Sequence, residues 1–486
     1  MFGSESWQDD DHISGESVSP EQKSIGDTER TEKRLQPTLK FLVAFGVGAF
    51  FFLFPVQYEG QTTIPLDVLL GFVQSTSLLA VELFVLFVIF FGAILTSISM
   101  IHSHDIVDLN GRLGDSIQPG YWQTSNLFWA FRVVAIPLAL AMFFEVGPDW
   151  LLSDAIAGTS WDVLMITIVL VIPIGGIFVN LLAELGGLEF IGTLAQPVMR
   201  PLFNLPGRSA LDSAASWLGS FSIGYYLTRN VFDRGGYNKR EVFAICTCFA
   251  TANLGSVGAV AAILGVLNIF PVLLLLYLIA TLTVAVILVR LPPLSTVPEE
   301  YIAKPDPEPK FSGSVTDYFQ FAFNEGVKTA EEGKSILRAG IDGFVDGTKL
   351  TATILGTIMT IATAVLLLVA YTDVFELLAT PVVPVMDVLG IPDPETAAIA
   401  IIAGAGEYFV GATVAVETDV LTKSFVVIVT SAQAIFFAAS APMMVDMFDD
   451  IPMRFRDLTV LLVLRTALLI PIAAGLTHAA ASLGLI

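Results

Sequence analysis

The chain has 486 residues, of which 54% are hydrophobic and 14% charged, and its mean hydropathy is +0.74. Repeated long apolar runs exclude a soluble protein and indicate one that crosses the membrane several times. The net charge is −22, with 46 acidic against 24 basic residues, which argues against nucleic acid as a partner. Such an acidic excess, on loops facing both sides of the membrane, is typical of halophilic archaea with a salt-saturated cytoplasm.

Residues 1–40 are polar and mixed in charge, and they lack the basic start and short apolar run of a secretory signal. We expect a disordered, acidic cytoplasmic tail there, followed by a first span that directs insertion. Windows of about 20 apolar residues then predict nine spans. They lie at 41–56, 76–101, 127–146, 163–186, 240–265, 269–290, 347–371, 421–446 and 457–480. The second is expected to begin as a separate surface helix near Leu69.

Two further apolar stretches, 208–229 and 393–416, contain glycine-bracketed segments at Gly219–Gly224 and Gly406–Gly411. Such segments make a poor straight helix. Backbone N–H and C=O groups that leave the helical hydrogen bonds at membrane depth must find other partners. Lys and Arg prefer cytoplasmic loops. If both stretches enter and leave on one side, most basic residues fall on inner segments and none on outer loops. The sequence therefore predicts two re-entrant hairpins, with the N-terminus inside the cell and the C-terminus outside.

The second part of the chain repeats the order of elements in the first. In each copy a span precedes a proline-rich amphipathic stretch, at 194–206 and 378–392, then a hairpin and two more spans. Three full spans separate equivalent points, so the copies point in opposite directions, as in many secondary transporters. An ancient duplication with structural glycines is the alternative. We predict an all-α polytopic membrane protein with a scaffold at 41–162, a first repeat at 163–290, a cytoplasmic linker at 291–346 and an inverted second repeat at 347–486.

Further short segments occur in a characteristic order along the chain. They are Phe51–Pro55, Gly60, Thr63–Pro65, Gly219–Gly224 with Tyr225 and Arg229, Gly406–Phe409, Ser431–Phe437 and Arg465–Thr466. In this order they resemble the nucleoside-recognition Gate-domain membrane proteins, specifically the YjiH-like group. The Gate domain in turn looks like the transport core of concentrative nucleoside transporters, where two re-entrant hairpins and two partly unwound helices enclose a nucleoside and a cation. The resemblance implies hairpin tips at 219–222 and 406–408 and unwound stretches at 251–256 and 430–433.

The chain departs from those transporters at the first hairpin. This chain has Ser220 and Ser222 at the positions where those transporters present an acidic and amide-bearing tip. Gate domains also occur in iron-uptake proteins, so the resemblance describes an architecture and leaves the solute open. On this basis we expect Ser220 and Ser222 to contact the solute and Gly219 to bind an ion.

Glu407 is the leading candidate for a functional residue, because a carboxylate inside an apolar hairpin is costly unless paired or protonated. It could bind a sugar hydroxyl, a cation or a proton; the alternative is a surface glutamate on a misplaced hairpin. Arg465 lies about eight residues into the last span, where it needs a partner or a watery cavity. Glu407 and Asp446 are candidate partners, and a structural buried pair is as compatible with the sequence as a substrate contact.

The other candidates bring amide, hydroxyl and phenol groups to helix middles and the second hairpin tip, where they could bind a heterocycle or a cation. The expected substrate contacts are Tyr408, Asn253 and Gln433, and the expected ion ligands are Thr251, Ser256 and Ser431. Hydrogen bonding between helices is the alternative reading of the amide and hydroxyl groups. Glu82 could line an ion pathway, but a scaffold ion pair is favoured.

Metal chemistry has little support in the sequence. His102 and His104 lack accompanying ligands at metal spacing. Cys246 and Cys248 face opposite sides of an apolar helix, so we expect buried, inert thiols. A membrane-embedded enzyme would need a recurring catalytic set, and Asp449–Asp450 is the one near match.

We therefore predict a secondary transporter in the cell membrane that moves a small polar solute, such as a nucleoside or nucleobase, by alternating access. Na⁺ or H⁺ would be the coupling ion, and no other cofactor and no enzymatic activity are expected. Its partners would be the lipid bilayer and the solute, with a homo-oligomer left open. An ion or metal channel, or a non-transporting partner of another membrane protein, is the alternative. Within the linker, 312–340 suits a surface helix that braces the core or lies on the membrane.

Overall fold

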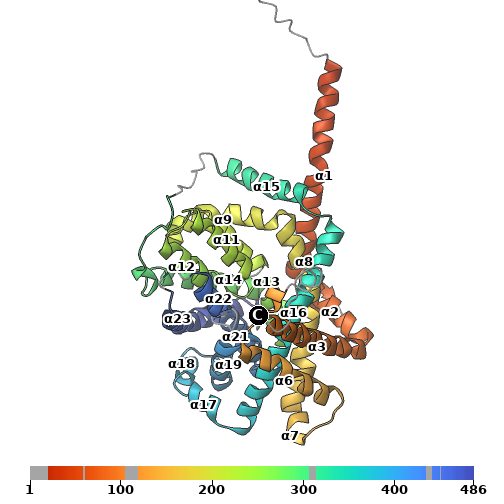
Figure 1. The fold of residues 1–486 in the computed structure, drawn as a ribbon, viewed down its shortest axis with the longest axis vertical. Coiled ribbons are helices and arrows are strands. Elements are labelled where there is room, and N and C mark those ends of the chain that lie inside the picture. Colours follow the sequence, from red (N-terminus) through yellow and green to blue (C-terminus); the bar gives the residue numbers. More distant parts are fainter. Residues whose placement is uncertain are drawn as a thin grey trace, which may run out of the picture.

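The computed structural model describes residues 20–58, 61–103, 119–219, 221–305, 314–433, 440–448, 450–451 and 453–486. The fold is that of an all-α polytopic membrane protein, as predicted, with its helices packed into one body (Figure 1). Among the described residues, seven helices are long and apolar enough to span a membrane. They are Leu35–Leu53, Leu78–His102, Asn126–Phe143, Asp154–Phe203, Leu267–Leu288, Ile336–Tyr371 and Phe455–Ser482. These coincide with seven of the predicted spans, and the other two, 240–265 and 421–446, each contain two shorter helices.

The N-terminal part of the chain forms a scaffold of helices and one small sheet. Its elements are α1 (Pro20–Leu53), β1 (Val56–Tyr58), β2 (Gln61–Thr63), α2 (Pro65–Thr76), α3 (Leu78–Ser103), α5 (Pro119–Trp122), α6 (Asn126–Phe143) and α7 (Asp149–Leu152). The two strands pair antiparallel, with Val56 opposite Thr63. α2 is the separate helix predicted near Leu69. Polar contacts join α3 to α6, since the Arg132 guanidinium donates to the Thr96 hydroxyl at 2.6 Å.

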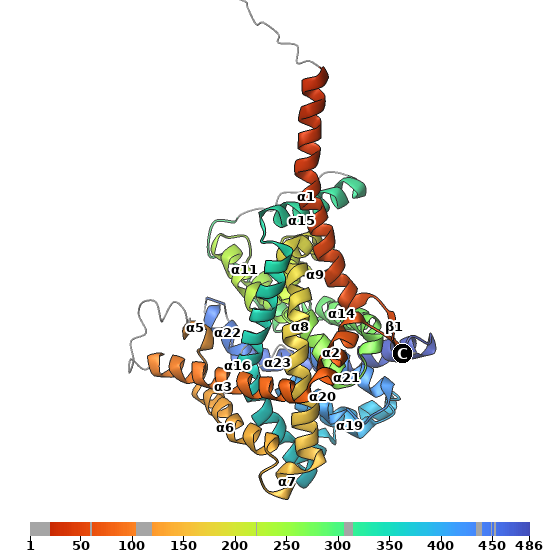
Figure 2. The ribbon, with the colours of Figure 1, turned by 90° about the vertical axis from the view of Figure 1, so that its right-hand side faces the viewer.

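The start of α1 differs from the prediction of a disordered tail over residues 1–40. The helix begins at Pro20 and continues without interruption into the first span. Its first half projects away from the body of the molecule (Figures 1 and 2). The apolar half of α1 is held by packing, so the costly nucleation step is already met and good helix formers upstream can extend it.

A π-helical segment, Asp154–Met165, leads into the region predicted as the first repeat, 163–290. It continues through α8 (Ile166–Leu182), a second π-helical segment (Ala183–Gly187), α9 (Leu188–Phe203), α10 (Ser209–Ala214), α11 (Phe221–Asp233), α12 (Lys239–Cys248), α13 (Leu254–Ile263) and α14 (Phe270–Leu288). α9 contains most of the amphipathic stretch predicted at 194–206. Gly186, at a φ of 98°, makes the bend between α8 and α9, a conformation that favours glycine.

The second repeat follows the same order. Its helices are α16 (Ile336–Tyr371), α17 (Val374–Ala379), α18 (Val383–Val388), α19 (Pro394–Gly406), α20 (Tyr408–Val414), α21 (Val420–Gln433), α22 (Ser440–Met447) and α23 (Phe455–Ser482). The stretch predicted as one interfacial helix at 378–392 is divided between the end of α17 and α18. Pro381 lies between them, and proline cannot donate the backbone hydrogen bond that would continue a helix.

The first helices of the two repeats, α8 and α16, lie side by side (Figures 1 and 2). Gly176 faces Gly343, and Ile172, earlier in α8, faces Gly347, later in α16. The two helices therefore run antiparallel, which is the orientation that an inverted repeat predicts. Their backbones approach so closely that a Cβ at position 176 would lie 2.6 Å from the Gly343 carbonyl oxygen, the kind of contact that small residues permit.

The linker helix α15 (Val315–Glu332) lies across α1 and α9 and so braces the core. The Tyr318 hydroxyl donates to the Thr193 carbonyl oxygen of α9 at 2.7 Å, and Phe323 packs edge-on against Phe41 of α1. Ser314 caps the helix by accepting the Asp317 N–H, and the hydrogen bonds that Ser314 returns lower the pKa of Asp317 below its ordinary value. Of the two roles predicted for this segment, the contacts favour bracing.

Candidate functional site

The second hairpin is formed by α19 and α20, which fold back on each other around Glu407. Glu407 has extended backbone, with φ −151° and ψ 114°, between the two helices. Its carboxylate accepts the Phe409 N–H at 3.2 Å and thereby caps α20. The two helices touch at Gly411, where a Cβ would lie 2.5 Å from the Ala400 carbonyl oxygen. Glu407, at 8% exposure, therefore lies at a buried hairpin tip, as predicted, and one of its roles is structural.

The two ends of this hairpin meet at its base. The Asp393 carboxylate, just before α19, accepts the backbone N–H of Asp419, just after α20, at 3.0 Å. The Asp393 N–H in turn donates to the Thr422 hydroxyl at 3.4 Å. The stretch from 393 to 419 thus begins and ends in the same place, which is the geometry that a re-entrant segment requires.

The first hairpin consists of α10, a π-helical turn at Ala215–Gly219, and α11. The Thr228 hydroxyl of α11 donates to the Asp212 carboxylate of α10 at 2.9 Å. Gly224 of α11 packs against Ser216, so that a Cβ there would clash with the Ser216 hydroxyl. Of the predicted tip residues, Ser220 lies outside the described residues, and nothing is described of the side chain of Ser222 or the surroundings of Gly219.

The span predicted at 240–265 is interrupted between α12 and α13, at residues 249–253, which we call the α12–α13 break. The unwound backbone predicted at 251–256 is confirmed for 251–253, while 254–256 form the first turn of α13. Asn253 makes that turn begin where it does, because its side chain accepts the Ser256 N–H at 2.8 Å. Asn253, proposed from the sequence as a substrate contact, is therefore also a helix cap.

The second predicted unwound stretch, 430–433, is wrong. These residues are the last turn of α21, and residues 434–439 beyond it lie outside the described residues. The Thr430 hydroxyl donates to the Val426 carbonyl four residues earlier, at 2.7 Å. Hydroxyl side chains can bond to a helix in this way without breaking it, so their presence did not mark a break.

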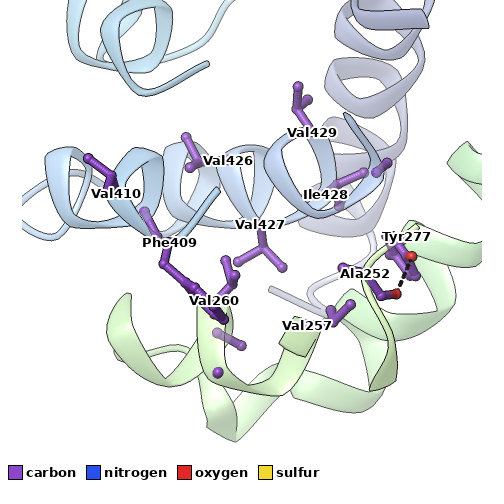
Figure 3. Close-up of a cluster of buried hydrophobic side chains, with 14 of the residues drawn as sticks. Ala252, Val257, Val260, Tyr277, Phe409, Val410, Val426, Val427, Ile428 and Val429 are labelled. Carbon is purple, nitrogen blue, oxygen red and sulfur yellow. Dashed lines mark hydrogen bonds between the residues drawn. The ribbon is translucent and has the colours of Figure 1, made fainter. Parts of the chain in front are cut away.

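Side chains and backbone from several helices converge on the α12–α13 break. The Ala252 N–H donates to the Ser431 carbonyl of α21 at 3.4 Å. The Tyr277 hydroxyl of α14 bonds to the Thr251 hydroxyl at 2.5 Å and donates to the Ala252 carbonyl at 2.8 Å, beside the apolar side chains of α13, α20 and α21 (Figure 3). Four predicted ligands from three elements, Thr251, Asn253, Ser256 and Ser431, thus lie at or next to this break.

The tip of the second hairpin reaches the same place. Tyr408, the first residue of α20, is hydrogen-bonded through its side chain to Ser256, and Phe409 points toward Val260 of α13 (Figure 3). Tyr277, which the sequence analysis did not select, completes the set. A single tyrosine in an apolar span resembles an ordinary core residue, so only its polar neighbours in space reveal its role.

Arg465 of α23 is fully buried, with 0% exposure. Its Nη1 donates to the carbonyl oxygens of Thr247 at 2.9 Å and Cys248 at 3.4 Å, at the C-terminal end of α12, where the helix dipole favours a cation. Of its two candidate partners, Glu407 forms no ion pair with Arg465. The side chain of Asp446 lies outside the described residues.

Two more polar side chains join neighbouring helices, and one of them, Tyr225, joins the two repeats. The Tyr225 hydroxyl of α11 lies 2.8 Å from the Ser440 hydroxyl of α22 and bonds to the Cys246 carbonyl at 3.4 Å. The Gln433 amide donates to the Ile401 carbonyl of α19 at 2.9 Å and accepts from the Thr466 hydroxyl at 3.3 Å. The amide nitrogen and oxygen of Gln433 therefore both form hydrogen bonds between helices. This is the alternative role that the sequence left open for this residue.

The candidates on α3 lie in the scaffold and outside this cluster. His102 is at the end of α3, and His104 lies outside the described residues. Glu82 in α3 forms no ion pair with a described residue, so the favoured scaffold pair is not seen. Within the described part of the chain, no group of three His, Cys, Asp or Glu side chains could hold a metal ion. Cys246 and Cys248 are free and buried, as predicted.

Comparison with known proteins agrees with the architecture. Residues 165–270, from the start of α8 to the start of α14, match the Gate family model, described as nucleoside recognition. This match confirms the Gate-domain resemblance over that range, while the assignment to the YjiH-like group stays a prediction. An uncharacterized protein of Alkalihalophilus pseudofirmus is 29% identical over 449 residues, which cover 90% of this chain and 94% of the relative.

Solved structures of CNTnw, a concentrative nucleoside transporter, are also similar. Its inward-facing substrate-bound state has a TM-score of 0.45 and 13% identity, with 90% of each chain covered. An outward-facing variant has a TM-score of 0.45 and 15% identity, covering 92% of this chain and 99% of that chain. Likeness at this level assigns no role to any residue of the present chain.

Proposed function

We propose that this protein is a secondary transporter whose solute binds at the α12–α13 break, between the two repeats. The observation that carries the proposal is the meeting of the repeats there, with Ala252 of the first bonded to Ser431 of the second. Irregular backbone at membrane depth is tolerated where it is buried in protein or lines a cavity. In transporters built from inverted repeats, such interrupted helices bind the solute and its coupling ion.

In the proposed arrangement both hairpins are re-entrant and the chain crosses the membrane nine times, with its N-terminus in the cytoplasm and its C-terminus outside. The joined ends of the second hairpin at Asp393 and Asp419 support re-entrance. The antiparallel packing of α8 and α16 supports opposite orientation of the repeats. Alternating access would then move one repeat against the other around a site that both share.

The residues at the site divide by chemistry. Glu407, Tyr408 and Asn253 offer carboxylate, phenol and amide groups to a polar solute, and Ser220 and Ser222 would approach from the first hairpin. Thr251, Ser256 and Ser431 offer hydroxyl and carbonyl oxygens, the ligands that Na⁺ takes. Gly219 would supply a further carbonyl oxygen as a ligand. Coupling to H⁺ would instead use the Glu407 carboxylate. A nucleoside or nucleobase is the first solute to test, because the matching family model is described by nucleoside recognition.

Uptake into liposomes tests the proposal. The purified full chain is reconstituted, and labelled uridine, uracil and orotate, which is uracil with an added carboxylate, are offered with an inward Na⁺ gradient, an inward H⁺ gradient and no gradient. We expect saturable uptake that one gradient drives above equilibrium. Protein-free liposomes are the control.

Three outcomes would contradict a secondary transporter. Uptake no faster than in protein-free liposomes for every solute offered would remove transport. Fast, unsaturable flux that never exceeds equilibrium would indicate a channel. Recovery of a chemically altered solute would indicate an enzyme.

A further inference from the structure

We propose that the transported solute carries a carboxylate, and that Arg465 binds this group. The inference rests on the proposed transport function and deepens it by naming a solute class. It goes beyond a neutral nucleoside or nucleobase, for which a buried guanidinium has no evident use. The argument depends on which nitrogen atoms of Arg465 are already occupied.

Among the described residues, one of the three guanidinium nitrogen atoms has hydrogen-bond partners. Nη1 donates to the Thr247 and Cys248 carbonyl oxygens. Nε and Nη2 are buried and have no hydrogen-bond partner in the part of the chain that the structure describes. In a planar guanidinium these two nitrogen atoms are adjacent, and their N–H bonds point the same way. That edge matches the two oxygen atoms of a carboxylate, which arginine binds through paired parallel hydrogen bonds.

No described acidic side chain compensates the charge of Arg465. An unpaired cation at 0% exposure is expensive to bury. The carbonyl oxygens at the end of α12 supply part of a negative charge, but no described Asp or Glu lies within 4.0 Å of the guanidinium. An anionic solute would supply the missing charge and fill both open donors in one step.

The position of Arg465 suits a solute contact because it borders the α12–α13 break. Its hydrogen-bond acceptors, Thr247 and Cys248, immediately precede the break. The two hydrogen-bonded tyrosines of the cluster also bond here, Tyr225 to the Cys246 carbonyl of α12 and Tyr277 to the Ala252 carbonyl within the break. A second orphan donor lies at the break, since the Ser431 hydroxyl is buried without a partner among the described residues.

Glu407 and Arg465 do not neutralise each other, so the site offers an acceptor and a cation separately. A solute with N–H or O–H donors at one end and a carboxylate at the other fits both. Uracil and orotate form a matched pair of probes, because orotate is uracil with one added carboxylate. The comparison therefore isolates the anionic group.

The experiment measures binding of uracil and orotate to the full chain in lipid nanodiscs by calorimetry and by ligand-induced shifts of the thermal midpoint. We expect wild-type protein to bind orotate about 10- to 100-fold more tightly than uracil, the range that hydrogen bonds to a charged group provide. Arg465→Gln should abolish this preference, and Arg465→Lys, which keeps the charge but loses the planar edge, should retain part of it.

Arg132→Gln is the matched control. Arg132 is also a buried arginine with a hydrogen bond to a neighbouring helix, but it lies in the scaffold between α3 and α6. Its replacement should lower the thermal midpoint and leave the preference for orotate unchanged. If Arg465→Gln does not fold, the wild-type comparison and Arg465→Lys still decide.

Three results would overturn the inference: equal binding of uracil and orotate by wild type, binding of neither, or a preference that survives in Arg465→Gln. Uptake of uridine or uracil without any orotate preference would refute the inference and leave the proposed transport function intact. Binding of orotate without uptake of any solute would refute the proposed transport function and leave Arg465 as a carboxylate-binding residue.

Discussion

Glu407 combines a structural and a chemical task at one residue. Its carboxylate caps α20 through the Phe409 N–H, which explains how an acidic side chain is tolerated at a buried hairpin tip. A single hydrogen bond to one oxygen leaves acceptor capacity on the carboxylate for a solute or a cation. The cap and the ligand role can therefore be separated by a substitution that keeps an oxygen and removes the charge.

We predict that Glu407→Gln folds normally and loses transport. The glutamine carbonyl can still accept the Phe409 N–H, so the thermal midpoint should change little. Uptake into liposomes under the driving gradient should fall about 10- to 100-fold, because a hydrogen bond to a charged group is lost. Normal uptake by this variant would remove Glu407 from the mechanism.

Tyr277 gives a second prediction at the residue scale. Its hydroxyl forms hydrogen bonds with the Thr251 hydroxyl and the Ala252 carbonyl. Tyr277→Phe removes both bonds and leaves these buried groups without this partner. We expect a loss of about 1–3 kcal/mol in the free energy of unfolding, measured by thermal unfolding in detergent. Tyr226→Phe, at a tyrosine that is 63% exposed, is the matched control and should be neutral. An equal effect of the two substitutions would contradict the role given to Tyr277.

At the scale of elements, close packing of α8 against α16 predicts an effect of a single methyl group. In Gly343→Ala the new Cβ would clash with the Gly176 carbonyl and with Asn180, at a cost of about 1–3 kcal/mol. Gly46→Ala is the control, because a Cβ there meets nothing within 4 Å and alanine favours the helix. Thermal unfolding should separate the two variants; a stable Gly343→Ala protein would mean that the helices readily move apart.

The sequence predicted the long helices well and the polar contacts between them poorly. Apolar windows located seven spans, because membrane insertion depends on local composition. The α12–α13 break carried a local signal in Asn253, a helix cap, and Gly255. The end of α21 carried similar hydroxyl groups that bond within the helix instead. Tyr277 could not be found, because its partners come from residues distant in sequence.

At the scale of the whole molecule, Arg229 links the two repeats through α11 and the end of α22. The α11 arginine forms ion pairs with Asp233 at 2.9 Å and with Asp450 at 3.0 Å, and it donates to the Met447 carbonyl at 2.9 Å. Asp450 and Met447 belong to the second repeat. The first hairpin is thus tied to the end of α22 by a group that is partly exposed and sensitive to salt.

We predict that Arg229→Gln increases opening between the repeats. The two native thiols, Cys246 and Cys248, are buried beside the α12–α13 break, so their alkylation by a small maleimide reports opening without added cysteines. The rate should rise about two- to fivefold, as expected for the loss of an exposed ion pair. Arg338→Gln is the control, because that arginine pairs only with Asp342 in its own helix among the described residues. Unchanged labelling in Arg229→Gln would show that this link does not limit opening.

One contact between the two repeats at the α12–α13 break uses main-chain atoms on both sides, since the Ala252 amide donates to the Ser431 carbonyl. Every amino acid except proline carries those amides, and all carry the carbonyls. Relatives can therefore carry other side chains at the break, and bind another solute, while this backbone hydrogen bond between the repeats is kept.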